Sequence, residues 1–461
     1  MRASIVIVAD DLTGAADCGV ACTAAGMRTV VVLNDATRAR DLHADAIAFD
    51  ADTRHQTSKQ ASAATERAVR QLCSVDATRV LYKKIDSTLR GNFAIEIGAA
   101  RKAISGSLLR PQGGNQAALA QPLAIVAPAF PAAGRTTIGG RMFVQGIPLE
   151  ETEVWRNEGI GGVANLPALL EEKAGLRTAS MELETVRSGA EAMAAAFTKY
   201  ATGNIEAVVC DAETEEHLSL IARAAAQQLD HPAFFAGSAG LARYLAEAFG
   251  LTRKLESHPS RQAIQPADNE FNQLMPDSAS PTHLSPSTQR RLLFVVGSMS
   301  QVSREQFRRL ENEPSVSLFA ISPGTLRAGP DSGRWRDAMT SIQTAIDFGN
   351  DVGITLDLKP GINLNESTFL SDALAQLLLP LVRQFAGLFC TGGETARALL
   401  DIAGAVGMRL IGEIEPGIPL GITEGGPRLA IVTKAGAFGT AETLLHCRAA
   451  LHRFLNQRTG L

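Results

Sequence analysis

Residues 387–395 read G-L-F-C-T-G-G-E-T, in which a short apolar stretch leads into adjacent glycines and then into a helix-forming segment. Residues 292–300 and 429–437 repeat this order of apolar stretch, glycine-containing turn and helix. In an α/β protein, glycine lets a ligand approach the backbone, and the amides at a helix N-terminus attract anions. Three such turns in one part of the chain predict a surface that binds phosphate or a nucleotide.

The composition is typical of soluble α/β proteins: of 461 residues, 45% are hydrophobic, 20% charged and 5% aromatic. The 44 basic and 48 acidic residues give a net charge of −4, so no general basic field attracts nucleic acid or an anionic membrane. The six cysteines form no C-x-x-C pair, and the sequence contains neither a signal peptide nor an apolar run of membrane-spanning length. We therefore expect a cytoplasmic protein with reduced thiols.

Residues 256–290 differ in composition from the rest of the chain. They contain five of the 20 prolines together with Ser, Gln, Asn and Asp, and only scattered large apolar residues. Such a segment cannot bury a core and predicts a linker or a surface excursion. The chain then divides into domains at 1–255 and 291–461, which are ordinary domain sizes.

Short apolar runs, most of them separated by segments of helical length, organise the first domain. Continuous apolarity with helical spacers predicts an α/β fold with a largely parallel sheet and helices on both faces. Ligands of such sheets bind beyond the carboxyl ends of the strands, so the residues directly after each run are candidate site residues. The runs are 4–8, 29–33, 46–49, 80–82, 123–127, 207–210 and 233–236.

Polar clusters follow the first and third runs. Asp10 and Asp11 are adjacent carboxylates, which repel each other and usually need a cation, backbone amides or a substrate hydroxyl. We expect one of them to cap the next helix and the other to serve a site. The second cluster, 50–55, contains Arg54 and is either a site loop or an ordinary solvated loop.

The densest polar cluster is 83–92, K-K-I-D-S-T-L-R-G-N, at the end of the fourth run. A solvated charge run would normally lie on a helix face, so this crowding at a strand end favours a function. Lysine and arginine can neutralise a substrate carboxylate or a phosphoryl group, while Asp86 and Ser87 can orient hydroxyls.

Two glycine-containing segments of the first domain are less specific. The loop 128–140 either completes a site or shapes a rigid turn. Residues 237–242, G-S-A-G-L-A, suggest a contact between domains, although glycines also permit close packing of a helix on a strand.

Several common signatures do not occur in the sequence. There is no G-x-x-x-x-G-K-[ST], H-E-x-x-H or G-x-S-x-G, which disfavours P-loop NTPases, zinc hydrolases and hydrolases with a nucleophile elbow. No turn has a full G-x-G-x-x-G with an acidic residue about 20 positions later, which weakens the alternative of an NAD-dependent dehydrogenase.

Seven motifs cover almost the whole chain: I-V-A-D-D-L-T-G-A-A-D at 7–17, K-K-I-D-S-T-L-R-G-N at 83–92, P-A-F-P-x-A-G-R-T-T at 128–137, G-S-A-G-L-A at 237–242, V-G-S-x-S at 296–300, T-G-G-E-T at 391–395 and K-A-G-A-F-G at 434–439. As a set they resemble the four-carbon acid sugar kinase family. The resemblance implies two α/β domains, each a largely parallel sheet flanked by helices. The N-terminal domain would bind the sugar acid and the C-terminal domain ATP, with the active site in the interdomain cleft.

The implied reaction is phosphorylation of the terminal hydroxyl of threonate, erythronate or a 3-oxo-tetronate to the 4-phosphate in carbohydrate acid catabolism, with ATP and Mg²⁺. The expected catalytic residues are Asp11, Asp86, Lys84 and Arg90, with Asp11 and Asp86 as alternatives for the residue that orients the attacking hydroxyl. Residues expected to bind the sugar acid are Asp10, Asp11, Arg54, Lys83, Lys84, Ile85, Asp86 and Ser87. Those expected to bind the nucleotide are Ser298, Gly392, Gly393, Glu394, Thr395 and Gly436. No metal ligands are assigned.

The chain departs from the family's pattern in two places. At 141–157 many members carry an Asp-Pro-containing segment that this chain does not have, which leaves the identity of the acid open. The segment 256–290 is longer than usual. Alternatives to a kinase are the dehydrogenase and a non-catalytic sugar-acid-binding protein, and the intact 83–92 cluster argues against the latter. The oligomeric state also stays open, a homodimer being one alternative.

Overall fold

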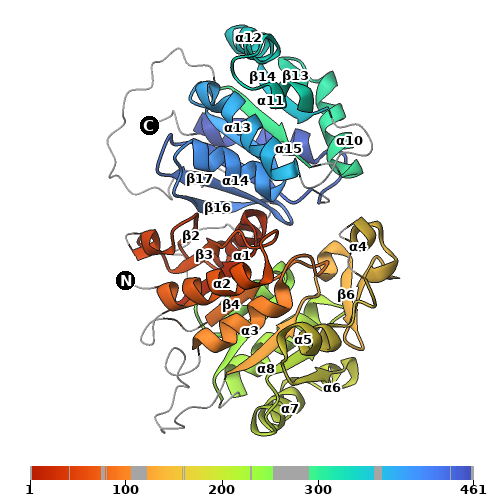
Figure 1. The fold of residues 1–461 in the computed structure, drawn as a ribbon. Helices are drawn as coiled ribbons and strands as arrows, with labels where there is room; N and C mark the ends of the chain where they lie inside the picture. The colour runs from red at the N-terminus through yellow and green to blue at the C-terminus, as the bar shows by residue number, and fades with distance from the viewer. Residues whose placement is uncertain are drawn as a thin grey trace. The chain divides into compact units, whose positions relative to one another are not determined.

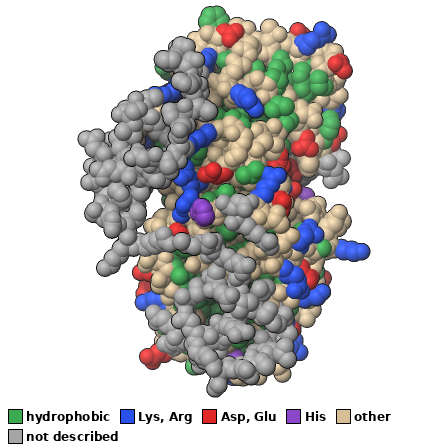
Figure 2. All heavy atoms as spheres, turned by 90° about the vertical axis from the view of Figure 1, so that its left-hand side faces the viewer, with side chains coloured by type: hydrophobic (Ala, Val, Ile, Leu, Met, Phe, Trp, Pro, Cys, Tyr) green, Lys and Arg blue, Asp and Glu red, His purple; other side chains and the backbone are tan. Residues whose placement is uncertain are grey.

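The computed structural model describes residues 3–40, 42–73, 78, 80–104, 122–157, 159, 161–228, 231–252, 290–298, 300–357, 366–436 and 438–457. The chain forms two compact units, Met1–Lys254 and Leu255–Leu461 (Figure 1). Almost all of the linker predicted at 256–290 lies outside the described residues. On the face that Figure 2 shows, Lys and Arg side chains are interspersed with Asp and Glu.

The first unit contains a parallel sheet with the strand order β2-β3-β1-β4-β11-β5-β10-β9. Most of its strands are buried along their whole length, which explains why they read as continuous apolar runs. The strands are β1 Ile5–Ala9, β2 Thr29–Val32, β3 Ala46–Asp50, β4 Val80–Lys84, β5 Leu123–Ala127, β9 Thr178–Met181, β10 Ala207–Cys210 and β11 Ala233–Gly237.

Helices cover both faces of this sheet. On one face α2, α3 and α5 enclose a core with the side chains of Val6, Val8 and Leu81. On the other face α9 lies between α1 and α8 and packs against both, and α8 also packs against α7. The helices are α1 Leu12–Ala24, α2 Ser58–Leu72, α3 Phe93–Ile104, α4 Glu153–Asn157, α5 Leu166–Ala174, α6 Leu183–Arg187, α7 Ala190–Thr202, α8 Glu215–Gln228 and α9 Ala239–Ala248.

A small antiparallel sheet is attached to the carboxyl end of β10. It consists of β6 Arg135–Ile138, β7 Arg141–Val144 and β8 Ile147–Pro148. The carboxylate of Asp211 accepts hydrogen bonds from the amides of Gly139 (2.7 Å) and Gly140 (2.9 Å), and both glycines have positive φ. The end of the loop predicted at 128–140 is therefore a hairpin turn that Asp211 holds in place.

The glycines of residues 237–242 have a role inside the first unit. A Cβ at Gly237 would lie 2.4 Å from the Ala127 carbonyl oxygen, and one at Gly240 would lie 2.3 Å from that of Ala129. Ser238 caps α9 and donates a hydrogen bond to Ala129 O at 3.0 Å. Close packing of α9 on the end of β5 accounts for these glycines, which is the alternative that the sequence also offered.

The second unit contains a sheet with the order β13-β14-β12-β15-β18-β17-β16. Its first five strands are parallel, whereas β17 runs antiparallel to both of its neighbours. The strands are β12 Leu292–Val296, β13 Val316–Ile321, β14 Asp351–Leu356, β15 Gly387–Thr391, β16 Gly407–Glu415, β17 Ile418–Glu424 and β18 Ala430–Lys434. The predicted α/β class with largely parallel sheets is confirmed in both units.

Two groups of helices flank this second sheet. Helices α10 and α15 pack together, and α11–α14 form a second contiguous group. The helices are α10 Gln301–Arg309, α11 Pro323–Ala328, α12 Gly333–Asp347, α13 Ser367–Val382, α14 Gly393–Ile402 and α15 Thr443–Gln457. In the part of the chain that the structure describes, no helix is long and apolar enough to cross a membrane.

Candidate functional site

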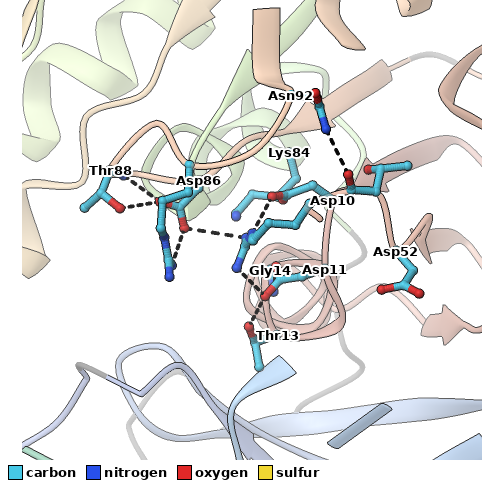
Figure 3. Close-up of polar contacts among 12 residues, drawn as sticks. Asp10, Asp11, Thr13, Gly14, Asp52, Lys84, Asp86, Thr88 and Asn92 are labelled. Carbon is cyan, nitrogen blue, oxygen red and sulfur yellow. Dashed lines mark hydrogen bonds and ion pairs between the residues drawn. The ribbon is translucent and has the colours of Figure 1, made fainter. Parts of the chain in front are cut away.

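Six predicted site residues of the first unit lie together beyond the carboxyl ends of three adjacent strands. The order β3-β1-β4 brings the segments after these strands side by side. We call the group the carboxylate cluster; Figure 3 shows it with its polar contacts. Its members are Asp10, Asp11, Arg54, Lys84, Asp86 and Arg90.

Arg54 connects the three carboxylates of this cluster. Its Nε lies 2.7 Å from Asp10 Oδ2, its Nη1 2.9 Å from Asp11 Oδ2 and its Nη2 3.5 Å from Asp86 Oδ2. Burial opposes ionisation of Asp10, but the charges of Arg54 and Lys84 outweigh it and hold the pKa of that carboxyl below its usual value. Each nitrogen of the Arg54 guanidinium thus lies within ion-pair distance of a carboxylate, and Nε and Nη1 donate hydrogen bonds.

Asp86 has both carboxylate oxygens occupied. Its Oδ1 accepts from the Thr88 amide (2.9 Å), the Thr88 hydroxyl and Arg90 Nε (3.0 Å), and its Oδ2 accepts from Arg90 Nη2 (2.7 Å). Burial raises the pKa of Asp86, but the nearby charges of Arg90 and Arg54 dominate and hold it well below the ordinary value. Asp86 is therefore a fixed anion that orients Arg90.

Asp11 accepts fewer hydrogen bonds than Asp86. It caps α1, with Oδ1 accepting from Gly14 N at 3.0 Å and Oδ2 accepting from Thr13 Oγ1 at 2.5 Å as well as from Arg54. Within the described residues the Gly14 amide is the one donor to Oδ1, which leaves that oxygen a further acceptor position. Asp11 therefore caps the helix and also contacts the cation Arg54, whereas the sequence predicted that Asp10 and Asp11 would divide capping and site roles between them.

Lys84 is the cation of the cluster whose donors are unused. Its side chain is buried, yet within the described residues its Nζ makes no hydrogen bond or ion pair, and Figure 3 draws no dashed line to it. Burial disfavours its charge, but Asp10 and Asp11 outweigh burial and raise its pKa. A Cβ at Gly14 would lie 2.6 Å from Lys84 Nζ, so glycine at that position leaves room for the ammonium.

Lys83 and Ile85 lie apart from the cluster. Successive residues of a strand point to opposite faces, so these two neighbours of Lys84 face α3. Lys83 Nζ is fully buried, 3.1 Å from Glu96 Oε2, and donates to Val8 O and Lys84 O. Ile85 belongs to the hydrophobic core. Ser87 lies half-buried on the turn after β4.

Thr13, Thr88 and Asn92 belong to the site but were not assigned from the sequence. Each threonine donates its hydroxyl to a carboxylate two residues earlier, a D-x-T spacing that occurs at both 11–13 and 86–88. Asn92 donates to the carbonyls of Thr53 (3.1 Å) and Gln56 (2.8 Å), which fixes the loop that carries Arg54. The repeated D-x-T was the available signal, because Asp and Thr side chains commonly form such local turns.

The three glycine turns of the second unit meet at the carboxyl ends of adjacent strands β12, β15 and β18. A Cβ at Gly297 would lie 1.9 Å from Thr395 Oγ1, and one at Gly436 would lie 2.0 Å from Ser298 Oγ. The amide of Gly297 donates to Thr391 O at 3.1 Å, and that of Gly392 donates to Lys434 O at 3.2 Å. These contacts confine the three turns to one surface.

Backbone groups dominate this second surface. Gly392 has φ +97° and begins α14 without a side-chain cap, so the first amides of the helix have no capping side chain. The hydroxyl of Thr395 is buried 3.3 Å from Ser371 Oγ, and Glu394 is half-buried in the first turn. The first amides of α14, which follow Gly392 and have no capping side chain, suit an anionic ligand.

The described residues contain no group of three or more His, Cys, Asp or Glu side chains that could hold a metal ion. Mg²⁺ in phosphoryl-transfer sites is usually held by one or two carboxylates together with the phosphates of the substrate. Glu394, in the first turn of α14, is one carboxylate of the second surface that could contribute to such a site.

Comparison with known proteins identifies the family. A sugar-binding N-terminal domain family matches residues 5–245, and a nucleotide-binding C-terminal domain family matches residues 293–444. The D-threonate kinase of Cupriavidus necator is 40% identical over 452 residues, which cover 97% of this chain and 98% of that protein. The chain belongs to the four-carbon acid sugar kinase family.

Further relatives in this family carry other substrate names. The 3-oxo-tetronate kinase of Methylobacterium radiotolerans is 29% identical, covering 96% of this chain and 98% of the relative. The D-erythronate kinase of Heliobacterium modesticaldum is 26% identical, covering 96% of each chain. A crystal structure from Salmonella typhimurium LT2 superposes with a TM-score of 0.72 at 20% identity, covering 97% and 99% of the two chains, and supports the fold.

The buried pair Lys83–Glu96 lends itself to a stability test. Removing one partner as Lys83→Met or Glu96→Leu leaves an uncompensated buried charge and should lower the free energy of unfolding by about 3–5 kcal/mol. The double variant should recover most of this loss, measured by urea denaturation of the full chain. Additive losses in the double variant would contradict a direct ion pair.

Proposed function

We propose that this protein is an ATP-dependent kinase that transfers the γ-phosphoryl group to the terminal hydroxyl of a four-carbon sugar acid, forming the 4-phosphate. The observation that supports this best is the buried, unbonded ammonium of Lys84 beside Asp11 in the carboxylate cluster. D-threonate is the first candidate acid, because the Cupriavidus necator relative, 40% identical over nearly the whole chain, carries that name.

Lys84 is the residue proposed to bind the carboxylate of the acid. Arg54 and Arg90 hold their guanidinium groups against Asp10, Asp11 and Asp86, whereas the ammonium of Lys84 has three donors to offer. The cluster contains three carboxylates and three cations, so an arriving anion meets no excess of negative charge.

Asp11 is proposed to orient the attacking hydroxyl. Its Oδ1 accepts from a single backbone amide, while both oxygens of Asp86 are occupied by Thr88 and Arg90. Phosphoryl transfer depends mainly on positioning and charge neutralisation, so an acceptor that fixes the hydroxyl is sufficient.

The nucleotide is proposed to bind on the glycine turns of the second unit. The first amides of α14 and the turns at Ser298 and Gly436 supply donors for phosphate oxygens. Mg²⁺ would come with ATP and neutralise charge between the β- and γ-phosphates.

An ADP-release assay tests the reaction directly. The wild-type protein with MgATP should release ADP with at least one of D- and L-threonate, D- and L-erythronate and 3-oxo-tetronates, and phosphorus NMR should detect a 4-phosphate product. Acid binding without ADP release would favour a binding protein instead, and acid-dependent reduction of NAD⁺ would favour a dehydrogenase.

The role of Lys84 is tested by Lys84→Met, with Lys59→Met on the exposed face of α2 as the matched control. Loss of the cation should lower kcat/KM for the acid by about 10²-fold or more, since truncating one member of a buried charge pair costs about 2–5 kcal/mol. The KM for ATP should stay near the wild-type value in both variants. An unchanged kcat/KM for the acid in Lys84→Met would refute the assignment.

The alternative bases are separated by Asp11→Asn and Asp86→Asn. Asn still caps a helix well, so Asp11→Asn should fold and lower kcat by about 10²-fold or more. Asp86→Asn should mainly reduce the melting temperature, because Arg90 and Arg54 lose a buried anion. A larger loss of kcat in folded Asp86→Asn than in Asp11→Asn would assign the base to Asp86.

A further inference from the structure

Lys434, the last residue of β18, is a fully buried lysine that the proposed reaction does not use. Its Nζ donates hydrogen bonds to three carbonyls of the following turn, those of Ala435 (3.1 Å), Gly436 (3.0 Å) and Phe438 (3.0 Å). Ser303 Oγ lies 3.4 Å from the same nitrogen. The ammonium therefore has its donors filled by backbone oxygens of one turn.

Helix α10 binds the same carbonyls from a second direction. The hydroxyls of Ser300 and Ser303 each donate to Gly436 O at 2.7 Å. Gln306 Nε2 donates to Phe438 O at 3.1 Å and to Thr440 O at 2.7 Å. The carbonyl oxygens of the turn are thus gathered on the side of Lys434 and α10.

This arrangement determines the direction of the amides. In a trans peptide the C=O of one residue and the N–H of the next point in opposite directions. Because the carbonyls of Ala435 and Phe438 point to Lys434, the amides of Gly436 and Gly439 point away from it. Within the described residues the Gly436 amide donates no hydrogen bond, and Gly436 packs against Ser298, a predicted nucleotide contact.

We infer that Lys434 is a positioning residue, which gathers the carbonyls of the turn after β18 so that the amides of Gly436 and Gly439 are presented to the phosphates of the nucleotide. The inference rests on the proposed binding of ATP to this surface. Lys434 itself does not reach the ligand, because it is fully buried and its protons are used within the turn.

Few neighbouring groups stabilise the positive charge of Lys434. Burial lowers its pKa to about 8, opposed by Cys447 of α15 and Glu415 of β16. Glu415 is itself bound to Thr443 and His446 of α15, and the α10 side chains that bind the turn, Ser300, Ser303 and Gln306, are neutral. Above pH 8 the neutral amine can donate only two hydrogen bonds, so the protonated form is the one that organises the turn.

Isothermal titration with MgATP at pH 7 and pH 9 tests the inference on the full chain. If only the protonated form is competent, about a tenth of the protein is competent at pH 9, so the wild-type Kd should rise about tenfold. Lys434→Met should bind MgATP about tenfold or more weakly at pH 7, with the extra pH dependence abolished. Lys434→Arg, which stays charged, should bind at pH 7 and lose the weakening at pH 9. Lys59→Met should behave as the wild type.

Three outcomes would overturn the inference: wild-type affinity at pH 7 in folded Lys434→Met, a wild-type pH profile in that variant, or no weakening of the wild type at pH 9. A wild type that binds MgATP at neither pH would refute the proposed function instead. If Lys434→Met does not fold, Glu415→Gln is the deciding variant. Loss of this carboxylate should move the midpoint of the pH dependence of the MgATP Kd to lower pH than in the wild type, because Glu415 raises the pKa of Lys434. An unshifted midpoint would count against Lys434.

Discussion

The fold of the first unit depends on balancing buried charge at the ends of three parallel strands. Asp10, Asp11 and Asp86 are buried close together, and the planar fork of Arg54 contacts each of them. Buried charges are tolerated when they are paired and hydrogen-bonded, which requires the donors of Thr13, Thr88 and Arg90 as well. Charge balance thus constrains the geometry of the cluster, in which Lys84 is the cation that we propose binds the ligand.

In the second unit, close steric contacts constrain the three glycine turns, whereas charge pairs constrain the cluster of the first unit. Two of its turns contain glycines where a Cβ would overlap the side chain of a neighbouring turn, Gly297 against Thr395 and Gly436 against Ser298. Each turn therefore limits the conformation of the next, and the surface on which we propose that the nucleotide binds is made largely of backbone. Such a surface recognises charge and shape with few side chains, which suits phosphates.

The positions of most strands of the first sheet and the polar residues at their ends were predictable from the sequence, whereas the order of the strands was not. Continuous apolar runs occur because most strands of the parallel sheets are buried on both faces, and polar residues directly after β1, β3 and β4 must meet because the strands are neighbours. The assignment of Lys83 beside Lys84 ignored the alternation of a strand, which places adjacent side chains on opposite faces. The same alternation explains why Ile85 lies in the core.

Features that depend on tertiary contacts could not be predicted from local patterns. The antiparallel pair β16 and β17 lies in a segment rich in Gly and Pro that reads as turns, and strand pairing across its bulges overrides that tendency. The hydrogen bonds of Thr13 and Thr88 follow a local spacing, whereas the choice of Arg54 as the common partner of three carboxylates depends on strand neighbours far apart in sequence.

Three lysines at strand ends illustrate how the surroundings determine what a cation can do. Lys83 is paired with Glu96 and connects β4 to β1 and α3. Lys84, one residue later, lies near Asp10 and Asp11, whose charges raise its pKa, and within the described residues its Nζ donates no hydrogen bond. Lys434 is surrounded by carbonyl oxygens, and burial lowers its pKa. A raised pKa suits a group that must stay charged to bind an anion. When backbone carbonyls accept most of the hydrogen bonds of a lysine, as they do at Lys434, the lysine instead holds the backbone in one conformation. The oxygens around each lysine therefore distinguish the buried ion pair of Lys83, the proposed ligand binding of Lys84 and the turn conformation held by Lys434.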